Sequence, residues 1–259
     1  MNINKVRSIY FSPTHTSAKI AEEIAKGTGF KLEGTIDLTF PIDGEWHFNN
    51  DELVIISAPV YGGRVVPIAV ERLKSIHGNS TFCVVISTYG NRDYDDALLE
   101  LNNLVKEQGL IPIAAGAFIG EHSYSTNKYP IGLNRPDEDD LIKAYDFGKD
   151  IAKKIDSIQS IKELTEISIK GNFPYKDYAP TPATPSTDET LCTQCCYCID
   201  ICPMECISLE DEIISDINKC IKCCACVKGC PNNARIYITP YSKILNEKCS
   251  ERKEPEIIL

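Results

Sequence analysis

The sequence predicts an α/β fold, a doubly wound sheet of five parallel strands, followed by a small module rich in cysteine. Two observations lead to this prediction. Apolar runs alternate with stretches of helical period along the first two thirds of the chain, and twelve of the 13 cysteines follow residue 187. Strands that alternate with helices form right-handed βαβ units, which build an open parallel sheet. A length of 259 residues suits two domains.

Four short runs are apolar for nearly their whole length, as parallel strands covered on both faces are. They are residues 6–11, 53–58, 82–87 and 111–118, with 35–39 as a weaker fifth strand. Between them, apolar residues recur at helical spacing in 17–26, 97–105 and 141–155, and Pro67 opens another helix. Sheets of this kind bind ligands at the carboxyl ends of their strands.

Cysteine content and composition divide the chain into four parts. We assign residues 1–170 to the doubly wound domain, 171–187 to a Pro/Thr-rich linker, 188–239 to the cysteine-rich module and 240–259 to a C-terminal tail. The linker is rich in proline and has no apolar period, so we expect it to be extended. In the tail we find no site.

The charge balance excludes several kinds of partner. The net charge of −10 would repel nucleic acid and an anionic membrane surface. No apolar run approaches the ~20 residues that cross a bilayer, and the first residues do not form a signal peptide. We therefore expect a cytoplasmic protein, whose cysteines bind metal or do redox work rather than form disulfides. The oligomeric state stays open, and a homodimer is one option.

One cysteine pattern occurs twice, 28 residues apart. The run Cys-x2-Cys-x2-Cys-x3-Cys-Pro begins at Cys192 and again at Cys220. Three thiolates so spaced can surround one face of a cubane, while the fourth cysteine of each run reaches the other cluster. This assigns two [4Fe–4S] clusters, one held by Cys192, Cys195, Cys198 and Cys230 and the other by Cys220, Cys223, Cys226 and Cys202. A zinc site is the alternative, although zinc favours cysteine pairs separated by a longer spacer.

These repeats resemble the two-cluster bacterial-type ferredoxins over about residues 188–239. The resemblance implies a pseudo-symmetric α+β module, with two short hairpins and two helical turns, that passes single electrons at low potential. Its acidic residues outnumber its basic ones, which suits docking on a basic surface. Cys83, Cys196, Cys206, Cys224 and Cys249 remain outside the two sets, and for Cys83, within an apolar strand, we expect a packing role.

The first strand-to-helix turn has the residues of a phosphate loop. Hydroxyls and backbone N–H groups before a helix form a good cradle for a phosphate dianion. Residues 12–17, Ser-Pro-Thr-His-Thr-Ser, resemble the flavodoxin signature Ser/Thr-x-Thr-Gly-x-Thr. The resemblance implies that the loop binds the phosphate of FMN. His15 stands in place of the glycine of the signature. The candidate phosphate contacts are Ser12, Thr14, His15, Thr16 and Ser17.

Two further strand ends carry glycines and tyrosines. Flavodoxin-like domains hold the flavin ring between the corresponding loops, so the resemblance implies contacts from backbone amides and an aromatic face. The candidates are Pro59, Val60, Tyr61, Gly62 and Gly63 in one loop and Tyr89, Gly90, Asn91 and Arg92 in the other. Ordinary packing of the tyrosines and a solvated Arg92 are the alternatives.

A polar loop follows the fifth strand and includes His122 and Tyr124. Either residue could supply protons to a flavin or a substrate, and a merely hydrogen-bonded loop histidine is the alternative. Together these loops and the cysteine runs resemble flavodoxin-like proteins fused to a two-cluster ferredoxin, a family found in anaerobes.

The resemblance implies an iron–sulfur flavoprotein that relays electrons between its clusters and FMN, with a redox protein as partner: a ferredoxin, a flavoprotein or a reductase. It could be an electron carrier or an oxidoreductase. We also consider an FMN-dependent reductase of a small substrate and, from another class, a redox or oxygen sensor.

Overall fold

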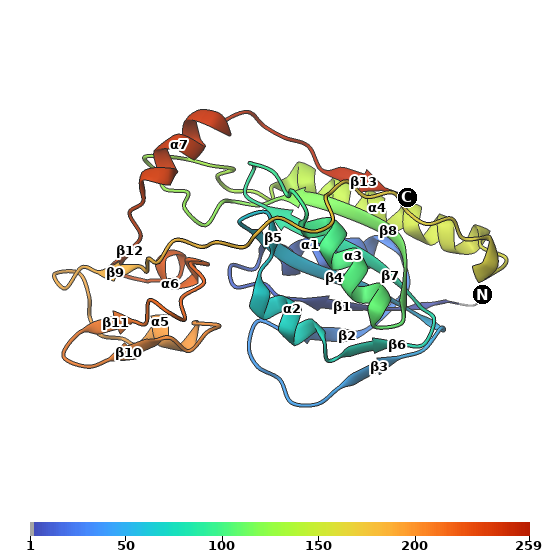
Figure 1. The fold of residues 1–259 in the computed structure, drawn as a ribbon, viewed down its shortest axis with the longest axis horizontal. Helices are drawn as coiled ribbons and strands as arrows, with labels where there is room; N and C mark the ends of the chain where they lie inside the picture. The colour runs from blue at the N-terminus through green and yellow to red at the C-terminus, as the bar shows by residue number, and fades with distance from the viewer. Residues whose placement is uncertain (1–2) are drawn as a thin grey trace.

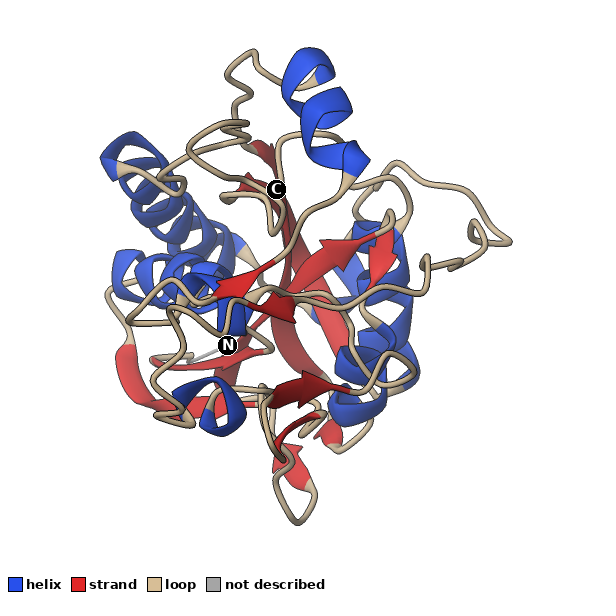
Figure 2. Ribbon diagram, turned by 90° about the vertical axis from the view of Figure 1, so that its left-hand side faces the viewer, coloured by secondary structure: helices blue, strands red, loops and turns tan. Residues whose placement is uncertain are grey.

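The computed structural model describes residues 3–259, and its largest part is a sheet sandwiched between helices (Figures 1 and 2). Five parallel strands lie in the order β2–β1–β4–β7–β8. They are β1 (Lys5–Tyr10), β2 (Lys31–Asp37), β4 (Glu52–Tyr61), β7 (Thr81–Tyr89) and β8 (Leu110–Ile119). The predicted parallel sheet is therefore confirmed, and its order is that of flavodoxin-like folds.

Two apolar clusters cover the two faces of this sheet. On one face pack α1 (Thr16–Gly27) and α4 (Glu138–Ser157), and on the other α2 (Pro67–Leu73) and α3 (Ala97–Glu107). The minor elements are β3 (Trp46–Phe48), β5 (Arg64–Val65), β6 (Ile76–Gly78) and the 3-10 turn η1 (Ile161–Glu163). The weak strand begins at Lys31, earlier than predicted, because it is a partly exposed edge strand without a continuous apolar run.

The cysteine-rich module contains two small antiparallel pairs and two single-turn helices. Its elements are β9 (Ser186–Thr187), α5 (Tyr197–Asp200), β10 (Ile207–Leu209), β11 (Ile213–Ser215), α6 (Ala225–Lys228) and β12 (Arg235–Ile236). Only β10 and β11 form a hairpin. The other pair joins β9 to β12, because the two ends of the module meet.

The C-terminal tail returns from the module to the large domain (Figure 1). It forms α7 (Pro240–Lys248) and then β13 (Glu256–Ile258), which pairs antiparallel with β8 and extends the sheet. The sequence did not predict this sixth strand in line with the five. No helix within residues 3–259 is both long and apolar enough to span a bilayer.

The segment after α4, expected to be a linker, is attached to the large domain. The amides of Asn172 and Lys176 each donate to the Asp96 carboxylate at 2.8 Å. Asn103 donates to the Tyr175 hydroxyl, also at 2.8 Å. The segment is thus held against the start of α3 rather than free in solvent.

Candidate functional site

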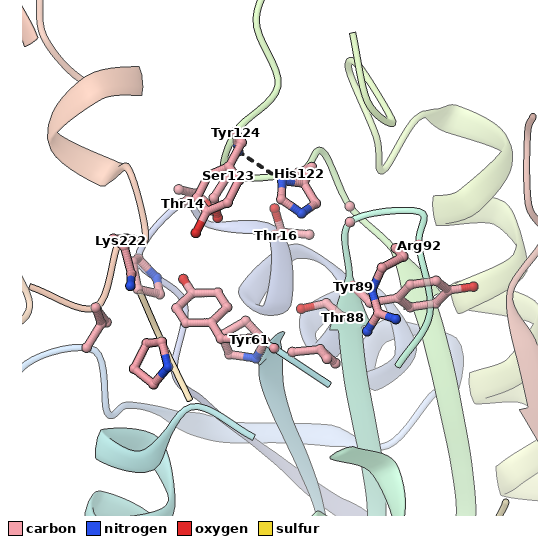
Figure 3. Close-up of a pocket in the computed structure, with 18 of the residues that line it drawn as sticks. Thr14, Thr16, Tyr61, Thr88, Tyr89, Arg92, His122, Ser123, Tyr124 and Lys222 are labelled. Atoms are coloured by element: carbon pink, nitrogen blue, oxygen red, sulfur yellow. Dashed lines mark hydrogen bonds between the residues drawn. The ribbon is translucent and has the colours of Figure 1, made fainter. Parts of the chain in front are cut away.

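A cavity of about 470 Å³ lies at the carboxyl ends of the parallel strands (Figure 3). This volume is in the usual range for small-molecule sites. The candidate residues that line it are Ser12, Thr14, Thr16, Ser17, Pro59, Val60, Tyr61, Gly62, Tyr89, Gly90, Arg92, His122 and Tyr124. Three candidates, His15, Gly63 and Asn91, are not among its lining residues. Loops that are far apart in sequence therefore meet around one cavity.

The loop after β1 is held in place by two of its own hydroxyl-bearing residues. Ser12 accepts a hydrogen bond from the Ala18 amide at 3.0 Å, and the Ser12 amide donates to the Thr39 hydroxyl at 2.8 Å. The hydroxyls of Ser17 and Thr88 are 2.6 Å apart. These side chains fix the loop, which leaves Thr14 and Thr16 facing the cavity (Figure 3).

The start of α1 offers free donors to an anion. Among the described residues, the amides of Thr14, Thr16 and Ser17 have no protein acceptor, and no acidic side chain lies in the first turn. Unpaired N–H groups and the positive end of the helix dipole favour a phosphate at such a place. His15 is exposed and has φ 63°, the left-handed region in which glycine is preferred.

The loops after β4 and after β7, which are expected to hold a flavin ring, present different groups to the cavity. Gly90 cannot carry a side chain, because a Cβ there would lie 2.3 Å from Cδ2 of His122. Tyr61 lines the cavity, where burial raises its pKa well above the usual value. Tyr89 is 6% exposed and packs edge-on against Tyr94, so part of its ring belongs to the core.

In the loop after β7, Asn91 and Arg92 both bind other groups of the protein. Asn91 is buried, and its Nδ2 donates to the carbonyl oxygens of Cys249 and Glu251 at 2.6 and 2.8 Å. It therefore anchors the tail and points away from the cavity, contrary to the expectation of a flavin contact. Arg92 lines the cavity but forms an ion pair with Asp95, so its charge is already partly balanced.

His122 and Tyr124 form a local pair in the loop after β8. The Tyr124 amide donates to Nδ1 of His122 at 3.0 Å (Figure 3). Burial, with the charges of Lys228 and Arg92, lowers the pKa of His122 to about 4. Burial likewise raises the pKa of Tyr124 far above its usual value. Neither group titrates near neutral pH, which makes both poorly suited to proton transfer there.

The eight candidate cysteine ligands line two further small cavities. One contains Cys192, Cys195, Cys198 and Cys230, and the other Cys202, Cys220, Cys223 and Cys226. Each cavity therefore takes three cysteines from one run and the fourth from the other. Within residues 3–259, no three His, Cys, Asp or Glu side chains are placed to hold a single metal ion. A cubane makes no such demand, since each thiolate binds a different iron.

The remaining cysteines divide between packing and the cavity walls. Cys83 is fully buried in β7, as expected. Cys196 lines the first cysteine cavity, and Cys206 and Cys224 line the second. The second cavity also adjoins the large one, because Ile221 lines both.

Comparisons with known proteins found solved structures that are similar to this chain at low sequence identity. No protein-family model and no curated protein matches this chain. An archaeal flavodoxin structure is 13% identical, covers 59% of this chain and 99% of its own, and gives a TM-score of 0.38. An NADH:FMN oxidoreductase in its apo form is also 13% identical, with 62% and 94% covered and a TM-score of 0.41.

A third similar structure is rubredoxin oxygen:oxidoreductase from Desulfovibrio gigas. It is 15% identical, with a TM-score of 0.41, and the match covers 60% of this chain but only 36% of that longer protein. We describe the large domain as flavodoxin-like because of its strand order.

Several cavity residues were missed because they come from the expected linker, module and tail. They are Lys176, Asp177, Tyr178, Ala179, Pro180, Thr181, Ile221, Lys222, Tyr241 and Leu245. The tail thus contributes Tyr241 and Leu245 to a site, where the sequence suggested none. No motif marks these residues, since they reach the cavity only through the packing of the module and the tail.

Proposed function

We propose that this chain is an iron–sulfur flavoprotein that relays electrons between two [4Fe–4S] clusters and FMN. The observation that carries the proposal is the common wall of two cavities. Ile221 lines both the large cavity at the strand ends and the cavity of Cys202, Cys220, Cys223 and Cys226. A one-electron site would therefore directly adjoin the flavin site.

The large cavity fits FMN in two ways. The free amides of Thr14, Thr16 and Ser17 suit its phosphate, and Tyr61, which lines the cavity together with Gly90, suits its ring. Bound FMN would supply both one- and two-electron chemistry. The protein residues would orient the ring and exclude water, and they need no catalytic acid to do so.

The cysteine cavities fit two cubanes. Each contains four candidate ligand thiols that no disulfide engages, in the crossed arrangement that the repeated run predicts. The clusters would supply single-electron transfer. Free thiols of this kind also suit the reducing cytoplasm, where we expect the protein to act.

The module is docked on the large domain, which favours direct transfer. Nη2 of Arg72 on α2 donates to the carbonyl of Pro203 at 2.8 Å, next to Cys202. Lys228 forms an ion pair with Glu121 at 2.6 Å. These contacts hold the second cysteine cavity beside the large one, so the relay does not depend on a chance encounter of tethered domains.

The two cysteine sets would have different tasks. Cys195 is exposed, whereas Cys223 and Cys226 are buried beside the large cavity. The cluster at Cys195 would exchange electrons with a redox partner, and the acidic module favours a partner with a basic surface. The buried cluster would pass each electron to FMN.

A reductase acting on a small substrate is the main competing function. It would need a proton donor in the cavity, and His122, Tyr124 and Tyr61 are the residues considered for this role. Burial moves the pKa of His122 down and those of both tyrosines up, away from neutral pH. This favours the carrier, in which these groups only contact the flavin.

Purification without oxygen, followed by iron, sulfide and flavin analysis, tests the cofactors. We expect about eight Fe, about eight sulfides and about one FMN per chain. Zinc in place of iron, or a chain that binds no FMN, would overturn the proposal.

Stopped-flow spectroscopy tests the relay itself. Reduced ferredoxin should reduce the FMN rapidly in the whole chain, whereas NAD(P)H alone should do little. His122→Ala should leave this transfer nearly unchanged, because outer-sphere transfer requires proximity and no acid. Fast direct reduction by NAD(P)H, or substrate turnover abolished by His122→Ala, would favour the reductase instead.

A further inference from the structure

A buried guanidinium lies between the two cysteine cavities. Arg235, at the start of β12, is 3% exposed. Its Nη2 is 3.9 Å from Sγ of Cys226, a candidate ligand of one cluster. The same residue lines the cavity of the other set, which includes Cys198 and Cys230. One residue therefore lies at both candidate cluster sites.

This positive charge has no carboxylate partner within the described chain. Its Nη groups donate to neutral oxygens of Thr187, Ser215 and Pro185, and its buried Nε has no hydrogen-bond partner at all. By contrast, the other buried arginine, Arg135, forms an ion pair with Asp140. An unpaired buried charge is strongly unfavourable, so a counter-charge is expected at Arg235.

The first copy of the repeat has an apolar residue at the position of this arginine. The 28-residue offset between the two runs aligns Arg235 with Ile207, just as it aligns Ala234 with Cys206. Ile207 begins β10 and packs in the core of the module. An apolar residue thus serves the first copy of the strand, and the second copy carries a charge in its place.

We propose that Arg235 serves both clusters. Its positive charge compensates the negative charge of their thiolate ligands and raises their reduction potentials. The inference rests on the proposed function. A cubane ligated by four thiolates is anionic, and each electron it accepts from a one-electron donor adds negative charge. A fixed positive charge in a low-dielectric site stabilises the reduced form more than the oxidised one. Local charge and hydrogen bonds to sulfur are known to set cluster potentials.

The test is an anaerobic redox titration of the full chain, followed by EPR. Arg235→Gln should lower the midpoint potential of both clusters, each by about 59 mV, which is a tenfold change in a one-electron equilibrium. Arg235→Lys should retain most of the wild-type value, since it keeps the charge. Lys219→Gln is the matched control: it removes an exposed charge next to Cys220, where solvent screens it, and should shift the potentials much less.

Several outcomes would overturn this role. One is an Arg235→Gln protein with full iron and unchanged potentials, and another is an Arg235→Lys protein shifted as far as Arg235→Gln. Should the neutral variants fail to hold iron, iron content becomes the measurement. The role then requires Arg235→Lys to retain iron where Arg235→Gln and Arg235→Ile lose it, and equal loss in all three contradicts it. A wild-type chain without clusters would instead refute the proposed function.

Discussion

The large domain and the cysteine-rich module differ in the kinds of side chain that they bury. Two clusters of aliphatic and aromatic side chains cover the two faces of the parallel sheet. The core of the module consists of Cys198, Cys202, Cys206, Ile207, Ile213 and Cys226, four of which are cysteines. The first region gains its stability from apolar burial. The second has too small an apolar core for that and would depend on its clusters.

This difference has a consequence for how the regions are joined. The module is held at both of its ends, by the segment that follows α4 and by the tail that forms β13. Tyr94 and Glu256 bond side chain to side chain, and Asn91 binds the tail at Cys249. The stable region therefore fixes the position of the less stable one.

Removal of iron should have the largest effect. It should destabilise the module and leave the large domain folded. After anaerobic chelation, we expect the amides of residues 188–239 to lose most of their protection in hydrogen exchange, because thiol ligands without iron do not form a stable core. The strands β4, β7 and β8 should stay protected. Persistent protection of α5 and α6 without iron would show that the module folds by apolar packing alone.

Loss of one cysteine ligand should affect only the module, where it should remove one cluster. Cys202→Ala should reduce iron from about eight to about four per chain, with the loss in the cluster of Cys220, Cys223 and Cys226. Because Sγ of Cys206 is only 3.6 Å from Sγ of Cys202, it could replace the lost ligand. The double variant Cys202→Ala/Cys206→Ala excludes that rescue, and EPR identifies the cluster that remains.

Cys83→Ala is the matched control in the other region. Cys83 is fully buried in β7, so its replacement should leave the iron content unchanged and lower the free energy of unfolding by roughly 1–2 kcal/mol. If Cys202→Ala instead damages the cluster of Cys192, Cys195 and Cys198, the crossed assignment is wrong.

The sequence predicted features that depend on local pattern. Long apolar runs predicted four of the parallel strands, and cysteine spacing predicted which thiols would share a cavity. It missed β13, because three residues carry no period and pair only with the distant β8. It also missed the cavity lining from Lys176 to Thr181, which depends on hydrogen bonds to Asp96 formed across the fold.

The phosphate loop gives the next prediction, which concerns the large domain. Thr14→Glu should abolish FMN binding, a loss of at least about 100-fold, because a carboxylate would face the phosphate. Riboflavin, which has no phosphate, should be affected far less. Thr14→Val is the control, since it removes the hydroxyl and adds no charge, and fluorescence titration measures all three proteins. Equal losses for FMN and riboflavin would place the phosphate elsewhere.

The smallest effect is expected at His15, where the loop departs from the flavodoxin signature. This residue has φ 63°, and its side chain is exposed, makes no capping hydrogen bond and does not line the cavity. A left-handed conformation costs a non-glycine residue about 1–2 kcal/mol, while glycine loses more backbone entropy on folding. His15→Gly should therefore raise the free energy of unfolding by at most about 1 kcal/mol and preserve or strengthen FMN binding. His15→Ala keeps the strain and serves as the control. A large loss of affinity for FMN, but not for riboflavin, in both variants would instead make the histidine a phosphate ligand.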